Sequence, residues 1–562
     1  MDRVWTQYYE PGVPADITFA ERTLVEMFHE TCHAFPDRPA VTLKGKTLTY
    51  AELESQVERF ASALAGLGVT VDSRVALWMP NVPQMIIAYF ATLRLGAQAV
   101  GTNPLYVERE LEHQLNDAGV SVVVTLDFLW WGKLRGIVSR TPVRHVVVTS
   151  IPDYLPFPLN VLAPLKLKRT GQYVKVPREP RVHFFRELLA AGGPPAPRAS
   201  YDWHHPAQLL YTGGTTGVAK GVVLTHRNLS CNAQQAVSWF RNLDMGREVL
   251  LACLPYFHSF GNMVSFLWPI ALGAHIVLAP NPRDINDLVS SIRRYRVTLF
   301  PAVPAHYTGI NKHPKVDRID ISSVKYCFSG SAPLPVEVMT RFERLTGGKI
   351  TEGFGLTETS PITHANPLAG LRKPGSIGLP LPGTDMKIVD AETGTRELGP
   401  NEEGELCVRG PQVMAGYWNR PDETAAMIRD GWLYTGDLAR VDEQGFTFIC
   451  GRKKDLIIVG GVNVYPDEVD QVLAAHPKVL EAATIGLPDA RLGERVKSFV
   501  VLRPGTQATA EEILGHCRRE LAPYKIPRDV AFVPELPKSA MLKILRRELR
   551  AREMSGIPTP VG

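Results

Sequence analysis

The sequence is poor in cysteine, and its few cysteines form neither an obvious metal site nor a disulfide framework. Seven cysteines are scattered over 562 residues, and none belongs to a C-x-x-C pair. An odd, scattered set is typical of free thiols in a reducing compartment. The first residues also lack the apolar run of a secretory signal. We therefore expect a cytoplasmic protein without a zinc site.

An apolar run long enough to cross a membrane is also missing. The longest stretch without Asp, Glu, Lys or Arg, residues 249–282, is interrupted by Pro255, Asn262 and Pro269. A membrane-spanning helix needs about 20 consecutive apolar residues. We therefore expect this stretch to be folded inside the protein.

Charge of one sign is scarce as well, because the net charge is only +5. The part from Arg452 onward holds 18 Lys and Arg against 14 Asp and Glu, so most of the surplus is C-terminal. This bias is too weak to indicate nucleic-acid binding, whereas it fits a phosphorylated small molecule. We expect no nucleic-acid partner.

Helical and strand patterns alternate in the N-terminal part. Residues 51–68 place Leu53, Val57 and Phe60 on one helical face, and residues 74–79 are typical of a buried strand. Such alternation predicts a parallel sheet covered by helices. The chain is also too long for one core. We predict an α/β protein with a large N-terminal domain of helix-packed β-sheets (residues 1–451).

After residue 451 the pattern changes to short helices and strands. A helix is expected over residues 508–521, with Thr509 as its N-cap. The spacing predicts a small α+β C-terminal domain (residues 452–562), which is of ordinary domain size.

A proline-rich segment interrupts the alternation between residues 151 and 171. The later residues 188–200 are loop-like. The proline-rich segment mixes apolar side chains with Lys166, Lys168 and Arg169. Two interpretations stay open: a surface insertion, or a peripheral contact with a membrane surface, because apolar groups beside cations suit an anionic interface.

The stretch YTGGTTGVAKG, residues 211–221, is rich in glycine and threonine. Backbone N–H groups of such a loop can point at one anion. It is not the common phosphate loop, in which Lys directly follows Gly, because Lys220 lies three residues after Gly217. On these residues alone it is either a flexible turn or another kind of nucleotide loop.

Five further segments look unlike ordinary packing. Alone, each has a plain explanation: a turn, a helix cap or a solvated basic face. In the segment around Asp437 we expect a strand that ends at this residue. In order, the segments are SGSAPLP (329–335), EGFGLTETSP (352–361), GWLYTGDLA (431–439), GRKKDLIIVGGVNVYP (451–466) and PKSAMLKILRREL (537–549).

Taken together and in this order, the segments resemble those of the AMP-forming acyl-CoA synthetases. The resemblance covers about residues 20 to 550 and includes the glycine- and threonine-rich loop. Within that family the chain is most similar to bacterial long-chain fatty acid–CoA ligases, on the stretches WTQYYEPGVPADI, TNPLY and LPYFHSFG.

The resemblance implies a nucleotide site. Glycines free the loop backbone and threonines add donors for the ATP phosphates. It assigns Glu358 and Thr212 to Mg²⁺, and Asp437 with Arg452 to the ribose. The remaining implied ATP contacts are Gly213, Gly214, Thr215, Thr216, Gly217 and Lys220 for the phosphates, and Gly330, Ser331, Ala332, Pro333, Gly353, Phe354, Gly355 and Thr357 for adenine and the α-phosphate.

The resemblance also implies a two-step reaction. A fatty carboxylate would attack ATP to give acyl-AMP and pyrophosphate, and CoA would then displace AMP. The implied catalytic residues are Lys543, Glu358, Thr357 and His258, although His258 could equally be a satisfied loop histidine. Between the steps a mobile C-terminal domain would rotate about Lys454 and bring the loop Gly460–Gly461 to the substrate.

Three positions depart from the family pattern. Phe354 stands where many members have Tyr, which removes a hydroxyl contact. Leu542 replaces the usual Gly before the catalytic Lys, and Leu lacks the backbone freedom of Gly. Ile458 replaces a Lys that some members carry.

The substrate stays less certain than the reaction type. Residues 249–282 and 301–310 are apolar and could wall an acyl tunnel or form plain core. Alternatives are a ligase for a medium-chain, short-chain or aromatic acid, an acyl-AMP ligase that loads a carrier protein, and a non-catalytic nucleotide-binding relative. A homodimer and a contact with the inner face of the membrane are left open.

Overall fold

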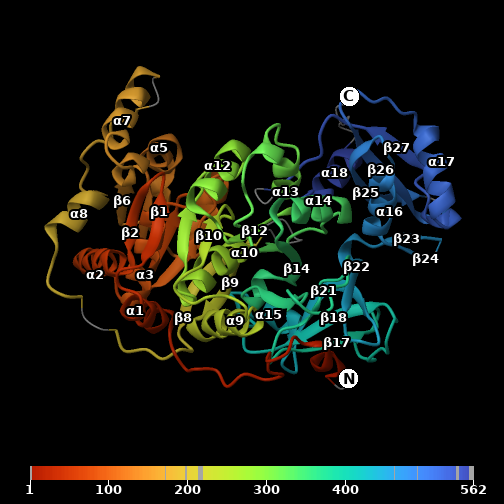
Figure 1. The fold of residues 1–562 in the computed structure, drawn as a ribbon, viewed down its shortest axis with the longest axis horizontal. Coiled ribbons are helices and arrows are strands. Elements are labelled where there is room, and N and C mark those ends of the chain that lie inside the picture. The colour runs from red at the N-terminus through yellow and green to blue at the C-terminus, as the bar shows by residue number, and fades with distance from the viewer. Residues whose placement is uncertain are drawn as a thin grey trace.

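A computed structural model describes most of the chain, namely residues 3–170, 173–196, 199–212, 219–460, 462–489, 491–539 and 543–555. Several residues singled out in the sequence lie outside these ranges: Gly213, Gly214, Thr215, Thr216, Gly217, Gly461 and Leu542. The described part contains four sheets, three in a large N-terminal unit and one in a small C-terminal unit (Figure 1).

The first sheet has eight strands in the order β19-β9-β8-β4-β3-β5-β6-β7. Neighbours from β8 to β7 are parallel, whereas β9 returns antiparallel to β8. The predicted alternation is therefore confirmed, with α2 (Tyr50–Gly66), α3 (Pro83–Arg94) and α4 (Glu108–Asp117) between strands. The strands are β3 (Arg74–Trp78), β4 (Gln98–Gly101), β5 (Val122–Leu126), β6 (His145–Thr149), β7 (Val182–Phe184), β8 (Pro206–Thr212), β9 (Lys220–Thr225) and β19 (Gly416–Tyr417).

The second sheet has nine strands in the order β16-β15-β14-β13-β12-β10-β11-β1-β2. Residues 249–282 supply β10, a set of short helices and β11, and most of them are buried, as expected. Its strands are β1 (Pro39–Leu43), β2 (Lys46–Thr49), β10 (Val249–Ala252), β11 (His275–Leu278), β12 (Leu299–Ala302), β13 (Tyr326–Ser329), β14 (Lys349–Gly355), β15 (Ile362–Ala365) and β16 (Leu379–Pro380).

Aromatic rings join these two sheets into one core. Phe266, in the turn η5 (Met263–Leu267), packs edge-on against Tyr89 and Phe90 of α3, at centroid distances of 4.9 and 5.5 Å. Phe90 also stacks on Phe28 of α1 (Leu24–Ala34) at 4.1 Å. Burial of such large rings is the main source of stability for a core of this kind.

The third sheet is antiparallel and holds Asp437. Its strands are β17 (Asp385–Val389), β18 (Gly404–Arg409), β20 (Ile428–Arg429), β21 (Trp432–Val441) and β22 (Thr447–Arg452). The expectation that the strand ends at Asp437 is wrong, because β21 continues to Val441. A register shift between Leu438 and Ala439 bends the strand there instead.

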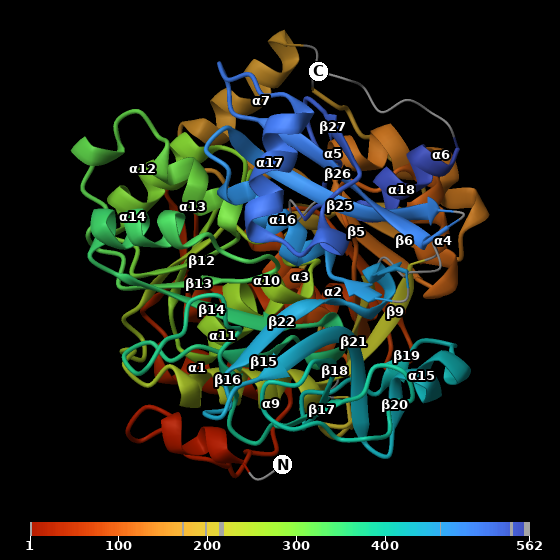
Figure 2. The same ribbon diagram turned by 90° about the vertical axis from the view of Figure 1, so that its right-hand side faces the viewer.

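The chain leaves the third sheet at Arg452 and enters the small unit through the turn η8 (Lys453–Asp455). The small unit has its own sheet and its own apolar cores, and it lies on the right of the large unit in Figure 1 and faces the viewer in Figure 2. The predicted cap is confirmed, because Thr509 accepts a hydrogen bond from the Glu512 backbone N–H at 3.2 Å. Its elements are β23 (Ile457–Val459), β24 (Val462–Val464), α16 (Pro466–Ala475), β25 (Val479–Asp489), β26 (Gly493–Leu502), α17 (Ala510–Glu520), β27 (Asp529–Phe532) and α18 (Arg546–Met554).

The proline-rich segment is partly helical, although no helix was predicted there from its sequence. It contains an 11-residue helix, α7 (Leu159–Arg169), with Pro164 inside it. Leu, Ala, Lys and Arg are good helix formers, and they outweigh the one hydrogen bond that Pro164 removes.

Candidate active site

The candidate site lies where β13 and β14 end. These strands are parallel neighbours, so the segments that follow them emerge at the same edge of the sheet. Ligands of open α/β sheets bind outside the carboxyl ends of the strands. The turn from Gly330 to Pro333 follows β13, and the short helix η7 (Thr357–Thr359) follows β14. The structure thus brings these two sequence-predicted segments together.

Close backbone packing explains two of the glycines. A Cβ atom on Gly355 would lie 1.7 Å from the Pro361 carbonyl oxygen, and one on Gly330 would lie 3.0 Å from the Phe260 ring. Ser331, the next residue, has a left-handed backbone with φ of 69°. Small residues are therefore needed for this turn and for the end of β14 to approach their neighbours.

Phe354 lies between Gly353 and Gly355 near the end of β14, with its ring half-buried. The ring faces His364 on the neighbouring strand β15, edge-on at 6.3 Å. An aromatic face is available for stacking, whereas the hydroxyl of the usual tyrosine is absent.

Glu358 and Lys220 are linked through Tyr417. The Tyr417 hydroxyl donates to Glu358 Oε1 at 2.7 Å, and Lys220 Nζ lies 5.5 Å from the centre of the Tyr417 ring. Lys220 also forms an ion pair with Glu423. Burial, together with the Glu358 carboxylate, raises the pKa of Tyr417. Tyr417 therefore contacts the Glu358 carboxylate through its hydroxyl and the Lys220 ammonium group through its ring.

Thr212 and Lys220 stand opposite each other at the ends of β8 and β9. The loop between them is the glycine- and threonine-rich stretch. Since β9 packs against η7, the base of this loop lies beside Glu358. Thr357 is fixed from the other side, where its hydroxyl lies 3.1 Å from that of Ser259.

Asp437 is almost fully buried and carries one satisfied and one unsatisfied oxygen. Its Oδ1 pairs with Arg452 Nε at 2.9 Å across β21 and β22. Its Oδ2 is buried and has no hydrogen-bond partner among the residues that the structure describes. Burial raises the pKa of Asp437, while Arg452 and Lys543 oppose that rise. A buried acceptor without a donor is costly, and it would be satisfied by a ligand hydroxyl.

Lys543 comes from the small unit, and its charge affects the pKa values of groups in the large unit. The residue is exposed to solvent, yet the protein atoms around it, together with the charge of Arg452, lower the pKa of Lys543 to about 8. Burial and the charge of Lys543 lower the pKa of His258 to about 4. The structure therefore brings Lys543, Asp437 and His258 into one electrostatic neighbourhood.

His258 also has the plain role considered from the sequence. Its Nδ1 accepts a hydrogen bond from the Phe260 backbone N–H at 3.3 Å and so caps the short helix α10 (Ser259–Asn262). The two roles are compatible, because this contact uses one ring nitrogen.

The predicted hinge lies beside this cluster, because Lys454 is two residues from Arg452 and its charge opposes the raised pKa of Asp437, whereas the predicted CoA loop lies apart from it. Lys454 is in η8, where the chain passes between the units. Gly460 follows β23 with φ of 58°, and its N–H donates to the Leu492 carbonyl at 2.8 Å. Figure 1 places the β23–β24 hairpin at the outer edge of the small unit, away from β14.

The apolar segments considered for a tunnel are packed as core. Tyr256 stacks on Phe266 at 4.9 Å, and the buried Tyr307 hydroxyl donates to the Phe300 carbonyl at 3.0 Å. The helix after His258 contains the π-helical turn η5, a feature frequent at functional sites. The tunnel stays a prediction.

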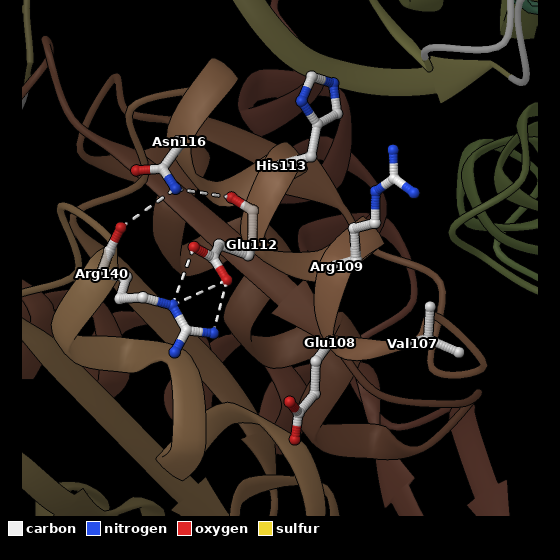
Figure 3. Close-up of a pocket in the computed structure, with 7 residues that line it drawn as sticks. All are labelled: Val107, Glu108, Arg109, Glu112, His113, Asn116 and Arg140. Carbon is white, nitrogen blue, oxygen red and sulfur yellow. Dashed lines mark hydrogen bonds and ion pairs between the residues drawn. The ribbon is translucent and has the colours of Figure 1, made fainter.

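A separate surface hollow of about 810 Å³ lies beside α4 (Figure 3). There, Glu112 pairs with Arg140 at 2.7 Å, whereas Arg109 and His113 point the other way. His113 Nε2 lies 3.4 Å from the Ala219 carbonyl, next to the base of the glycine- and threonine-rich loop. None of the sequence-predicted site residues lines this hollow. The lining residues are Val107, Glu108, Arg109, Glu112, His113, Asn116 and Arg140.

A set of ion pairs behind Lys543, here called the clamp, was not predicted from the sequence. Arg546, three residues later, forms ion pairs with Asp467 and with Asp470 Oδ2, the latter at 2.6 Å. Both acids lie on α16, which packs against β22. The clamp therefore holds the segment that carries Lys543 against α16, the helix of the small unit that packs against β22. Tyr417 was also missed, and its only sequence signal is an aromatic residue in a short polar stretch.

Comparisons with known proteins agree with this arrangement. Residues 28–418 match the AMP-binding enzyme family, and residues 468–543 match the AMP-binding enzyme C-terminal domain. The chain is 43% identical over 558 residues to a long-chain-fatty-acid–CoA ligase of Bacillus subtilis (strain 168), covering 98% of each chain.

Solved structures with the same fold carry nucleotides. One is the anthranilate CoA ligase AuaEII in complex with anthranoyl-AMP, with a TM-score of 0.84, 28% identity and coverage of 96% of this chain and 98% of that one. Another is ATP-bound MatB from Rhodopseudomonas palustris, with a TM-score of 0.82, 30% identity and coverage of 95% and 100%.

The clamp generates the first prediction. Asp470→Ala should destabilise the small unit by about 3 kcal/mol, because it leaves the buried Arg546 with one carboxylate instead of two. Asp467→Ala is the matched control and should cost less, since Asp467 is the more exposed partner. Hydrogen exchange of α16 and β25 measures the local opening free energy. Equal exchange in both variants and the unmodified protein would contradict the clamp.

Proposed function

Because the chain belongs to the AMP-binding enzyme family, we propose that it is a long-chain fatty acid–CoA ligase. It joins a fatty acid to CoA and converts ATP to AMP and pyrophosphate. The named activity of the Bacillus subtilis relative supports the substrate class. The observation that carries the proposal is the proximity of Lys543, from the small unit, to Asp437 and His258 of the large unit. The charge of Lys543 lowers the pKa of His258 and opposes the raised pKa of Asp437.

The nucleotide is proposed to lie across the ends of β13 and β14 and beside Asp437 within β21. The unsatisfied Asp437 Oδ2 accepts a ribose hydroxyl, and Arg452 makes a second ribose contact. The turn at Gly330 and the ring of Phe354 contact adenine. Lys220 exchanges its partner Glu423 for the ATP phosphates, which carry more negative charge than one carboxylate.

The residues present also fit a magnesium ion bound with the phosphates. Glu358 offers a carboxylate fixed by Tyr417, and Thr212 offers a hydroxyl at the end of β8. Mg²⁺ prefers a few protein oxygens together with phosphates and water. When bound, the ion supplies charge neutralisation between the two anionic substrates.

In the first step, a carboxylate oxygen of the fatty acid bonds to the α-phosphorus of ATP. The bond from that phosphorus to the bridging oxygen breaks, and pyrophosphate leaves with the electron pair. Two anions must meet, so the protein contributes mainly alignment and positive charge. Lys543 supplies that charge at the cleft, and His258 lies beside the acyl carboxylate.

In the second step, the CoA sulfur forms a bond to the acyl carbon, and the thiol proton is released to solvent. The bond between the acyl carbon and the phosphate oxygen breaks, and AMP leaves with the electron pair. We propose that the small unit rotates about Lys454 before this step. The rotation withdraws Lys543 and brings the loop of Gly460 and Gly461 to the substrate. Its basis is the single chain crossing at η8, which can turn without breaking a sheet.

A second candidate is a ligase for an aromatic acid, favoured by the anthranoyl-AMP complex among the similar folds. The purified protein is mixed with ATP, Mg²⁺ and acids from acetate to oleate, together with benzoate and anthranilate. We expect pyrophosphate release with C12–C18 acids and thioester only when CoA is present. Turnover restricted to aromatic or short acids would replace the fatty-acid proposal. An acyl-carrier protein in place of CoA tests the carrier-loading alternative.

Lys543→Ala tests the residue proposed to assist the first step. We expect pyrophosphate release to fall by about 10³-fold or more, because a charge that stabilises the transition state is lost, while ATP binding by calorimetry changes little. Lys538→Ala, which removes a nearby cation paired with Glu481 at 2.6 Å, is the control and should keep most activity. Equal losses in both variants would refute the specific role of Lys543.

The lowered pKa of Lys543 gives a pH prediction. The ammonium form is the active one, and it is lost as pH rises through about 8. We expect kcat/KM for pyrophosphate release, which reports the free enzyme, to fall above pH 8. Lys543→Arg should move this fall to higher pH in whatever activity it retains, because the guanidinium stays charged. An unchanged alkaline limb in that variant would assign it to another group.

A further inference from the structure

The helix α7 is exposed along its whole length. None of its residues is buried, and its main packing partner is the preceding turn η4 (Ile151–Tyr154). Figure 1 shows it projecting at the upper left, on the far side of the large unit from the small one. Packing within this chain therefore does not explain its sequence.

The segment exposes several apolar side chains at and near its start. Phe157, just before the helix, is 83% exposed, and the helix adds several exposed aliphatic side chains. An exposed group of apolar side chains of this kind marks an interaction site. The aliphatic residues are Leu159, Val161, Leu162 and Leu165.

The charge around the tip has one sign. No acidic residue occurs between Asp153 and Glu179, whereas the sequence there contains Lys166, Lys168, Arg169, Lys175 and Arg178. Within the described part of the chain, none of the three cations of α7 forms an ion pair with a carboxylate. A partner that covers this segment must be apolar and negatively charged.

We propose that Phe157 and α7 form a docking element for the surface of an anionic lipid bilayer. The apolar side chains enter the boundary between headgroups and acyl chains, and the cations contact the anionic headgroups. A second copy of the chain fits less well, because two such segments brought face to face would place like charges together. The inference rests on α7 alone and does not depend on the proposed catalytic function.

The element docks at the surface rather than spanning the bilayer. An 11-residue helix is about 16 Å long, roughly half of the hydrocarbon thickness. Among the residues that the structure describes, no helix has both the length and the apolarity that a membrane crossing requires.

Vesicle sedimentation of the full chain tests the proposal without ATP, acid or CoA. One set of vesicles contains phosphatidylcholine alone, and the other also contains phosphatidylglycerol. We expect binding to the second set only, and weaker binding at higher salt. One double variant carries Phe157→Ser and Leu162→Ser, and the other carries Lys166→Gln and Lys168→Gln. Each should bind the vesicles at least about tenfold more weakly than the unmodified protein.

Matched controls use exposed residues elsewhere on the large unit. Met245→Ser removes an apolar side chain that is 49% exposed, and Lys312→Gln with Lys315→Gln removes two cations. These variants should bind like the unmodified protein. All of these variants should keep its melting temperature, since none of the changed side chains is buried.

Two results would overturn the proposal. One is binding that is equal for both vesicle types or unchanged by the α7 variants. The other is absence of vesicle binding together with a dimer, measured by light scattering, that the α7 variants dissociate. That second result would assign the helix to contact between copies of the chain.

Discussion

The pair between Asp437 and Arg452 is the interaction on which the arrangement of the site depends. It joins β21 to the last residue of β22, directly before the chain leaves the large unit. It opposes the rise in pKa that burial alone causes for the Asp437 carboxylate. It also fixes the position of Arg452, after which the chain enters the small unit that carries Lys543.

The cations in and near the candidate site are paired with carboxylates, and the phosphates of a nucleotide can replace such carboxylates as partners. Lys220 is held by Glu423, Arg452 by Asp437, and Arg546 by Asp467 and Asp470. Each cation is thus kept in place while the site is free of substrate. Lys543 differs, because cationic neighbours and burial lower its pKa instead of raising it. An anionic substrate would favour its charged form.

Local patterns made much of the fold predictable. The face formed by Leu53, Val57 and Phe60 is buried in α2, as its spacing indicated. Contacts between distant segments were not predictable. Tyr417 reaches Glu358 because β19 pairs with β9, nearly 200 residues earlier in the chain. Nor did the prolines before α7 reveal a helix, since the surrounding residues outweigh Pro164.

Within the residues that the structure describes, the chain passes between the two units once, at η8. The small unit is therefore a tethered body whose local concentration near the cleft is set by the length of the connection. Tethering of this kind gives effective concentrations in the millimolar range. A weak and mostly polar interface is then enough to populate the docked arrangement, and it can be released again without a large energetic penalty.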